Sequence, residues 1–274
     1  MDKVAICGVL QLLGFHLCKE CLNLGIEVIG FDNFEKNKPI KDEMLMEIGR
    51  NANFQFIEAK EELDKFKRYL QDVEMFYYLN DELEDMSKIE QIAAICDELS
   101  MPVVTASSLE VYGKCDGICN EDAPLHPMTK YGKRKKLEEH YWLKDAEANG
   151  RQIAIFRLPN LFGPWQNPTD RFHQLAYQLV KNNVSLHTII NYSSLSRDYM
   201  FVNNAVDALL LAMNHRFSCE IYNLSFNEKK YCTKKIRTEL SYQPKYTYQQ
   251  GIEILEKHLM EILKLHPSLY ECDS

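Results

Sequence analysis

The segment from Val103 to Lys135 combines a tyrosine, a lysine and a serine at spacings that suit proton transfer. Tyr131 and Lys135 lie four residues apart in a charged, helix-favouring stretch, and residues i and i+4 share one face of a helix. An ammonium group beside a phenol stabilises the phenolate and lowers the pKa of the tyrosine, so Tyr131 could exchange a proton near neutral pH. Ser108, after the strand that begins at Val103, could add a third contact to a C–OH or C=O group. The same Tyr-Lys spacing occurs by chance on surface helices, so the surrounding elements must show whether this pair is functional.

The N-terminus has the element order of a dinucleotide-binding βαβ unit. A buried strand is predicted at residues 3–7, a periodic apolar segment ends at Gly25, and a second strand covers residues 27–31. The second strand finishes at Asp32, about twenty residues beyond the first glycine turn. Such a unit has at this point a carboxylate that binds a ribose hydroxyl.

The glycine turn of this unit departs from the usual spacing. It reads Gly8-x-x-Gln11-x-x-Gly14, with glutamine where glycine would let a diphosphate approach the helix N-terminus closely. The Gln11 amide could hydrogen-bond a phosphate, or the side chain could fill the phosphate site. The turn therefore indicates the fold more firmly than it indicates a bound cofactor.

Further strands and helices alternate along the chain. Strands are predicted at residues 54–58, 73–79, 103–105, 152–156 and 222–224, and helices at 41–48, 63–70, 87–99, 131–148 and 172–181. This alternation is typical of an α/β fold with a doubly wound parallel sheet of the Rossmann type. The ligand crevice of such a sheet lies at the carboxyl ends of its strands, at the topological switch point.

Five segments in sequence order resemble the extended short-chain dehydrogenase/reductase family, of the NAD-dependent nucleotide-sugar epimerase/dehydratase type. They are the glycine turn, SSLEVYG with EDAPLHPMTKYGKRK, RLPNLFGP, SRDYMFV and ELSYQPKYTYQQG. The resemblance extends from Val4 to about Leu263. It implies a Rossmann domain at residues 1–160, to which parts of 195–225 return, and a small discontinuous C-terminal region, mainly 161–274, that binds substrate.

The resemblance also implies roles for individual residues. Ser108 would be the hydroxyl partner, Tyr131 the acid/base, and Lys135 the residue that holds the ribose and acidifies the tyrosine. The cofactor contacts would come from Gly8, Gln11, Gly14, Asp32, Asn33, Leu79 and Lys135, and the substrate contacts from Ser108, Asn160 and Arg197. NAD is the expected cofactor, because the Asp32 carboxylate would repel the 2′-phosphate of NADP. NADP stays open as an alternative. The expected ligand is a nucleotide-sugar.

Two functional hypotheses remain open. The first is an epimerase or reductase. A dehydratase is disfavoured, because the family's dehydratases carry Asp-Glu after the serine, whereas Ser108 is followed by Leu109-Glu110. The second is a catalytically degenerate member that senses a ligand or binds a partner. It is favoured by Gln11, by Lys60 where the family has an acid that contacts adenine, and by the shortened segment after Asn80.

Composition limits the remaining classes of function. A net charge of −8 over 274 residues argues against a nucleic-acid binder. We expect a cytoplasmic protein without a membrane partner, because the apolar run at the N-terminus is too short for a signal peptide and no stretch is long enough to span a bilayer. The nine cysteines are interpreted as reduced thiols, and the Cys18/Cys21 pair lacks a matching second pair, so we expect no metal. A homodimer through helices near 87–99 and 131–148 is expected from the family.

Overall fold

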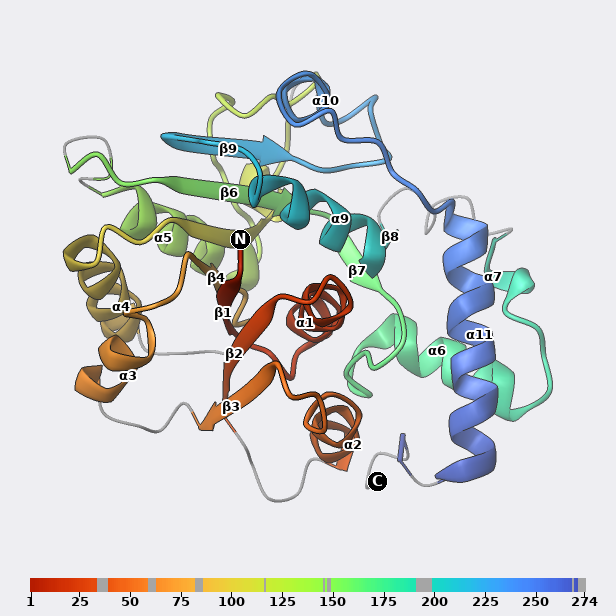
Figure 1. Ribbon diagram of the computed structural model, residues 1–274. Helices are drawn as coiled ribbons and strands as arrows, with labels where there is room; N and C mark the ends of the chain where they lie inside the picture. Colours follow the sequence, from red (N-terminus) through yellow and green to blue (C-terminus); the bar gives the residue numbers. More distant parts are fainter. Residues whose placement is uncertain are drawn as a thin grey trace.

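Seven parallel strands form the central sheet, in the order β3-β2-β1-β4-β5-β6-β9 (Figure 1). Their bounds are Lys3–Cys7 (β1), Glu27–Asp32 (β2), Phe54–Glu58 (β3), Met75–Tyr78 (β4), Val103–Ser108 (β5), Ile153–Leu158 (β6) and Cys219–Asn223 (β9). The computed structural model describes residues 1–33, 39–58, 63–81, 86–115, 117–144, 146, 149–190, 199–267 and 269–270. The strand order reverses between β1 and β4, which makes the carboxyl ends of these strands the switch point. The predicted doubly wound Rossmann-type sheet is confirmed.

Helices cover both faces of this sheet. Figure 1 shows α3, α4 and α5 on one side, and α1, α2 and α9 on the other. Their bounds are Leu12–Asn23 (α1), Pro39–Ile48 (α2), Leu63–Tyr69 (α3), Met86–Glu98 (α4), Lys130–Leu143 (α5) and Val202–Ala212 (α9). The 3₁₀-helix η1, Leu109–Tyr112, and the short helix α10, Lys234–Glu239, complete this part of the molecule.

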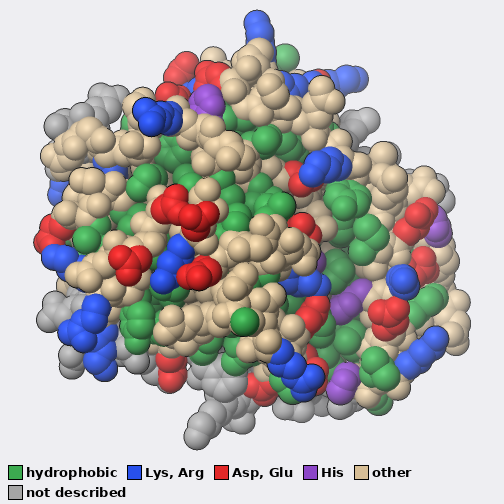
Figure 2. All heavy atoms as spheres, viewed as in Figure 1, with side chains coloured by type: hydrophobic (Ala, Val, Ile, Leu, Met, Phe, Trp, Pro, Cys, Tyr) green, Lys and Arg blue, Asp and Glu red, His purple; other side chains and the backbone are tan. Residues whose placement is uncertain are grey.

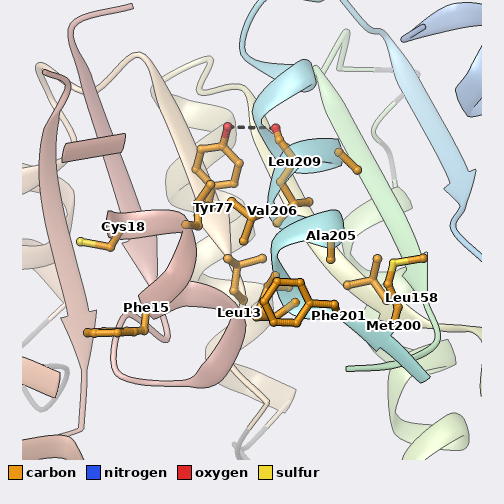
Figure 3. Packing of buried hydrophobic residues seen from close by; sticks show 14 of the residues in the cluster. Leu13, Phe15, Cys18, Tyr77, Leu158, Met200, Phe201, Ala205, Val206 and Leu209 are labelled. Atoms are coloured by element: carbon orange, nitrogen blue, oxygen red, sulfur yellow. Dashed lines mark hydrogen bonds between the residues drawn. The ribbon is translucent and has the colours of Figure 1, made fainter. Parts of the chain in front are cut away.

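The alternation of side chains along β1 explains the two-sided core. Val4 and Ile6 belong to the apolar cluster under α1, α2 and α9, whereas Ala5 and Cys7 belong to the cluster under α3, α4 and α5. Successive residues of a strand point to opposite faces of its sheet. In the first cluster, Tyr77 of β4 lies between residues of α1 and α9, and its hydroxyl donates to the Leu209 carbonyl at 3.3 Å (Figure 3).

A smaller group of elements stands beside the sheet (Figure 1). It contains the two-stranded parallel sheet of β7, Asn160–Phe162, and β8, Tyr199–Phe201, with α6 (Arg171–Lys181), α7 (His187–Ile190) and α11 (Tyr248–Leu265). A capping box at Thr247 and Gln250 begins α11, because each side chain bonds the backbone N–H of the other residue. The predicted domain division at residue 160 stays a prediction.

Three details differ from the sequence-based expectations. The helix that carries Tyr131 ends at Leu143 rather than near Ala148. The β7–β8 sheet was not predicted. Cys115 and Cys119 form a disulfide with Cα atoms 6.3 Å apart, so the expectation that all cysteines are reduced is wrong. The chain turns at Gly117, whose φ of +101° is favourable for glycine, and this turn brings the two cysteines together.

The described helices and the surface bear on possible partners. Within the described ranges, no helix combines the length and the apolar composition that crossing a bilayer requires. On the face drawn in Figure 2, lysine and arginine side chains are interspersed with aspartate and glutamate.

Candidate active site

The glycine turn joins β1 to α1 at the switch point of the sheet. Gly8 has a φ of +86°, and a Cβ atom there would lie 2.9 Å from the carbonyl carbon and oxygen of Leu79. A Cβ atom on Gly14 would lie 2.1 Å from the Gly8 carbonyl oxygen. Both positions therefore require glycine, because the start of α1 packs directly on the turn and on the end of β4. Leu79, predicted at the cofactor, contributes its backbone to this close approach.

The Gln11 side chain bridges from this turn to the residues that follow β4. Its amide nitrogen donates to Asn80 Oδ1 at 2.5 Å, and its amide oxygen accepts from the Asp81 backbone N–H at 2.6 Å. Gln11 is also the N-cap residue of α1, but its side chain makes no capping bond to the helix. The Gln11 side chain thus links the glycine turn to Asn80 and Asp81, and the two options that the sequence left open for it stay predictions.

Asp32 lies at the carboxyl end of β2 and is almost fully buried. Its carboxylate accepts from the Leu10 N–H at 2.8 Å and forms an ion pair with Lys41 Nζ at 2.6 Å. Lys41, at the start of α2, also donates to the Asn33 carbonyl at 3.2 Å. The sequence placed Asp32 and Asn33 correctly at this strand end but did not identify Lys41 as their partner. The negative charge of Asp32 is thus already balanced within the protein.

Tyr131 and Lys135 meet at a third residue, Asp81. The Tyr131 hydroxyl donates to both Asp81 carboxylate oxygens, at 3.0 and 3.1 Å, and Lys135 Nζ lies 2.8 Å from Asp81 Oδ1. The lysine is buried, whereas 54% of the Asp81 side chain is exposed. The predicted i, i+4 arrangement on α5 therefore brings the phenol and the ammonium to a single oxygen atom. Asp81 was not assigned a role from the sequence.

Charges around this pair are nearly balanced. Lys135 also donates to Glu138 Oε2 at 3.0 Å and to the Ala106 carbonyl at 3.3 Å. Arg134 bonds Glu138 Oε1 at 2.6 Å and the Asp81 carbonyl at 3.1 Å. Two cations thus face two carboxylates beside the neutral phenol. The acidic partners reduce the help that Lys135 can give to ionisation of the tyrosine.

The pKa values follow from this arrangement. Burial raises the pKa of Tyr131, and the charge of Asp81 raises it further, while Lys135 opposes both effects. Partial loss of water around its carboxylate disfavours the ionised form of Asp81, but Lys135, Tyr131 and Arg134 outweigh this effect and lower the pKa of the carboxyl group. The pKa of Lys135 is raised, because Asp81, Tyr131 and Glu138 together outweigh the effect of burial. Lys135 lowers the Tyr131 pKa as expected, but burial and Asp81 together outweigh it, so the expected net lowering of this pKa is wrong.

Ser108 ends β5 and begins the turn that packs against α5. Its hydroxyl accepts from the Glu110 N–H at 3.1 Å and so caps η1. Glu110 in turn accepts from the hydroxyl of Thr129, the N-cap residue of α5. A Cβ atom on Gly132 would lie 2.8 Å from the Glu110 carbonyl oxygen, so glycine permits this close packing. Ser108 is thereby fixed at the same edge of the sheet as Tyr131.

A buried polar network supports this edge from below. Arg157 of β6 forms two hydrogen bonds to Glu139 of α5, at 2.8 and 3.0 Å, and its guanidinium also donates to the Tyr112 hydroxyl at 2.7 Å. The Tyr112 hydroxyl donates to Asn223 of β9, and Ser107 donates to Glu139. Fully satisfied networks of this kind specify one arrangement of the elements that they join. The network therefore holds β5, β6 and α5 in fixed positions under Tyr131.

The remaining predicted residues lie apart from this cluster or outside the described part of the chain. Asn160 is an exposed residue of β7, next to the main sheet. Arg197, predicted to bind the substrate diphosphate, and Lys60, which stands where the family has an acid, lie outside the described residues. Among the described residues, no group of three or more His, Cys, Asp or Glu side chains is arranged to hold a metal ion.

A model of the NAD dependent epimerase/dehydratase family matches residues 4–225. The chain belongs to this family. A relative described as an uncharacterised UDP-glucose epimerase of Bacillus subtilis is 25% identical over 226 residues, which cover 76% of this chain and 71% of the relative. An uncharacterised protein of Methanocaldococcus jannaschii is 23% identical, covering 92% of this chain and 94% of that protein.

Solved structures of other members share the fold. UDP-glucuronic acid 4-epimerase from Bacillus cereus in complex with NAD has a TM-score of 0.77 at 20% identity, over 95% of this chain and 99% of that chain. The dTDP-glucose 4,6-dehydratase of Bacillus anthracis in complex with NAD has a TM-score of 0.77 at 16% identity, over 98% and 100%. At these identities the likeness establishes the architecture. The expected membership of the short-chain dehydrogenase/reductase type is confirmed.

Two side chains at this family site could not be found by matching motifs. Lys41 and Asp81 each contact a predicted site residue, but neither belongs to a segment that resembles the family. A signal was present in both cases. Asp81 is an acidic residue shortly after an apolar strand, at the same sheet edge as Asp32, and Lys41 begins a helix shortly after β2. Charged residues at the carboxyl ends of parallel strands converge on one crevice.

Proposed function

We propose that this chain binds NAD and catalyses epimerisation or reduction of a nucleotide-activated sugar, with Tyr131 as the acid/base. The proposal rests above all on one observation. The Tyr131 hydroxyl and the Lys135 ammonium contact the same Asp81 oxygen, at 3.0 and 2.8 Å. Because one oxygen atom can be held by both groups together, a hydroxyl oxygen of a ligand could take this position. A shared oxygen is the arrangement that proton exchange between a sugar hydroxyl and a tyrosine requires.

The residues of the turn fit the adenosine diphosphate part of NAD. Gly8 and Gly14 let α1 begin close to the turn and to the end of β4, and a helix N-terminus attracts phosphate through its unpaired N–H groups. Asp32 would accept a ribose hydroxyl, and Lys135 would contact the second ribose. When bound, the nicotinamide would accept the hydride of the sugar and return it. This chain would position the sugar, exclude water and move the proton at the Tyr131 hydroxyl.

The named activities of similar proteins support the choice of substrate. The Bacillus cereus protein has been solved in complex with UDP-glucuronic acid and NAD, and a further similar structure holds UDP-glucose and NAD. We propose that Asn160 and Arg197 bind the nucleotide diphosphate here, since a guanidinium group suits phosphate oxygens. Ser108 would hold the hydroxyl that reacts. Epimerisation is favoured over dehydration because Leu109-Glu110 stands where the dehydratases have Asp-Glu.

Substitution of Tyr131 by phenylalanine tests the role of the hydroxyl. Once turnover of a nucleotide-sugar has been established, Y131F should lower kcat by at least about a hundredfold, the usual contribution of a general acid/base. Tyr141, one residue before the buried Trp142 on the same helix, offers the matched control, and Y141F should retain the activity. Binding of the sugar should persist in Y131F. An unchanged kcat in Y131F would contradict the proposed mechanism.

A second function, as a ligand-sensing or partner-binding module, is favoured by the Gln11 bridge and by the Asp32–Lys41 pair. In both contacts, polar groups that a dinucleotide would bind are already hydrogen-bonded to other residues of the protein. Calorimetric titration of nucleotide-stripped protein with NAD and with NADP separates the two functions. Micromolar binding of NAD supports the enzyme, whereas no binding of either nucleotide at millimolar concentration would support the module. The homodimer through α4 and α5 stays a prediction, which light scattering after gel filtration would test.

A further inference from the structure

Asp81 holds the two groups that the proposed chemistry requires, and its own backbone is held on both sides. Its N–H donates to the Gln11 amide oxygen at 2.6 Å, and its carbonyl accepts from Arg134 at 3.1 Å. Its carboxylate receives the Tyr131 hydroxyl and Lys135. The contacts therefore come from the glycine turn and from α5 together. Asp81 thus links the glycine turn to the Tyr131–Lys135 pair.

We propose that Asp81 is an internal ligand of the Tyr131–Lys135 pair, and that it sets which molecules can use this pair by competing with their hydroxyl groups. A ligand oxygen within hydrogen-bond distance of both Tyr131 and Lys135 would have to occupy the position of Asp81 Oδ1. The carboxylate must therefore turn away before a sugar or ribose hydroxyl can bind, and a ligand that fails to replace both contacts is rejected.

The exposure of the two partners makes this exchange feasible. Lys135 is buried and keeps Glu138 as a second acidic partner at 3.0 Å, so loss of Asp81 leaves its charge paired. The Asp81 side chain keeps 54% of its surface exposed. A rotated carboxylate would therefore gain contact with water. When Asp81 leaves the pair, Glu138 remains as the carboxylate partner of both Lys135 and Arg134.

Asp81 also favours the protonated form of Tyr131. The charged groups that face the phenol are Asp81 from the segment after β4, and Arg134 and Lys135 from α5, with Glu138 bonded to both cations. Removing the charge of Asp81 leaves two cations against one carboxylate. Tyr131 should then ionise at lower pH. The internal ligand thus blocks the oxygen position and keeps the tyrosine inactive as a base until a ligand replaces it.

Phenolate absorbance during a pH titration tests the contact without any nucleotide. The signal of Tyr131 is isolated by subtracting Y131F from the wild type, and D81N/Y131F from D81N. We expect the Tyr131 transition in D81N to move to lower pH, with D81A as a second variant should D81N fold poorly. The control is D72N, which removes one charge just before β4, at the opposite end of that strand. An unmoved Tyr131 transition in both Asp81 variants would overturn the inference.

Affinity for NAD provides the second readout, and this part rests on the proposed function. D81A should bind NAD about tenfold more tightly than the wild type, as expected when a site that is open about a tenth of the time becomes permanently open. D72N should match the wild type. Equal or weaker binding of NAD by D81A would overturn the competition. If no variant binds NAD while the Tyr131 transition still moves in D81N, the inference about the internal ligand holds and the proposed function fails.

Discussion

Two carboxylates at the same edge of the sheet are each paired with a lysine, but they differ in their surroundings. Asp32 and Lys41 are 2.6 Å apart, and their side chains are only 1% and 6% exposed. Asp81 and Lys135 are 2.8 Å apart, and Asp81 is 54% exposed. Asp32 is the last residue of β2 and also accepts the Leu10 N–H, whereas Asp81 belongs to the segment that follows β4. Both pairs join an aspartate to a buried lysine, but only the aspartate of the second pair is exposed.

Because of this difference, we call the Asp32–Lys41 pair an anchor of the fold and the Asp81–Lys135 pair a replaceable contact. Removing one partner of a fully buried ion pair leaves an uncompensated charge, whereas an exposed carboxylate such as Asp81 can exchange its partner for water, and Lys135 then keeps Glu138. Asp32 should therefore stabilise the fold around the glycine turn. Asp81 should matter for ligand binding and for the ionisation of Tyr131, with little effect on stability.

The largest expected effect is the loss of the buried anchor. D32A should lower the free energy of unfolding by about 3–5 kcal/mol, because Lys41 is left buried without its carboxylate and the Leu10 N–H loses its acceptor. The double variant D32A/K41M should recover most of this loss, since an apolar side chain of similar length replaces the stranded charge. Urea unfolding followed by circular dichroism measures both. A loss in D81A as large as that in D32A would contradict the distinction between the two pairs.

A smaller effect on stability is expected for Gln11, whose side chain links the glycine turn to Asn80 and Asp81. Q11G removes both side-chain hydrogen bonds to Asn80 and Asp81 and should cost about 1 kcal/mol in the free energy of unfolding. Glycine is acceptable at the N-cap position of α1. The same variant should bind NAD more tightly, because the amide no longer crosses the crevice. Q11N is the matched control, as its amide is too short to make both contacts but retains a side chain in the crevice.

If Q11G is less stable but binds NAD no better than Q11N, the bridge is structural and does not limit access to the crevice. Improved binding in Q11G alone would show that the volume of the side chain matters. Improved binding in both variants would assign the effect to the hydrogen bonds that hold Asp81. Calorimetric titration at one fixed salt concentration distinguishes these outcomes.

The fold could be predicted because its signals are local. Strand β1 alternates between two apolar clusters, and the turn from Gly8 to Gly14 has steric requirements that only glycine meets. The β7–β8 sheet escaped prediction because each of its strands has only three residues and the two are distant in sequence. The disulfide between Cys115 and Cys119 escaped because all nine cysteines were interpreted as reduced thiols.

The candidate site could be predicted only where its residues are neighbours in the sequence. Tyr131 and Lys135 are neighbours on one helix, so their spacing alone places them together. The Asp81–Tyr131 contact joins residues 50 positions apart, and no periodic pattern connects them. The direction of the Tyr131 pKa was wrong because a local pattern reveals the nearby cation but neither the burial of the phenol, which has the largest effect, nor the carboxylate of Asp81.

The smallest expected effect concerns the stability that Asp81 itself contributes. Its neighbours lower the pKa of Asp81 in the folded protein, so the unfolded chain binds the proton more readily and the pair stabilises the fold at neutral pH. This contribution should be at most about 1 kcal/mol, because the Asp81 side chain is 54% exposed and Lys135 also pairs with Glu138. It should be fully present above the unfolded aspartate pKa of about 3.9 and decline as the pH falls further, through the folded value. The difference in unfolding free energy between the wild type and D81N, measured from neutral to acidic pH, should therefore shrink toward zero in acid. A difference of several kcal/mol, or one that grows as the pH falls, would place Asp81 among the anchors with Asp32.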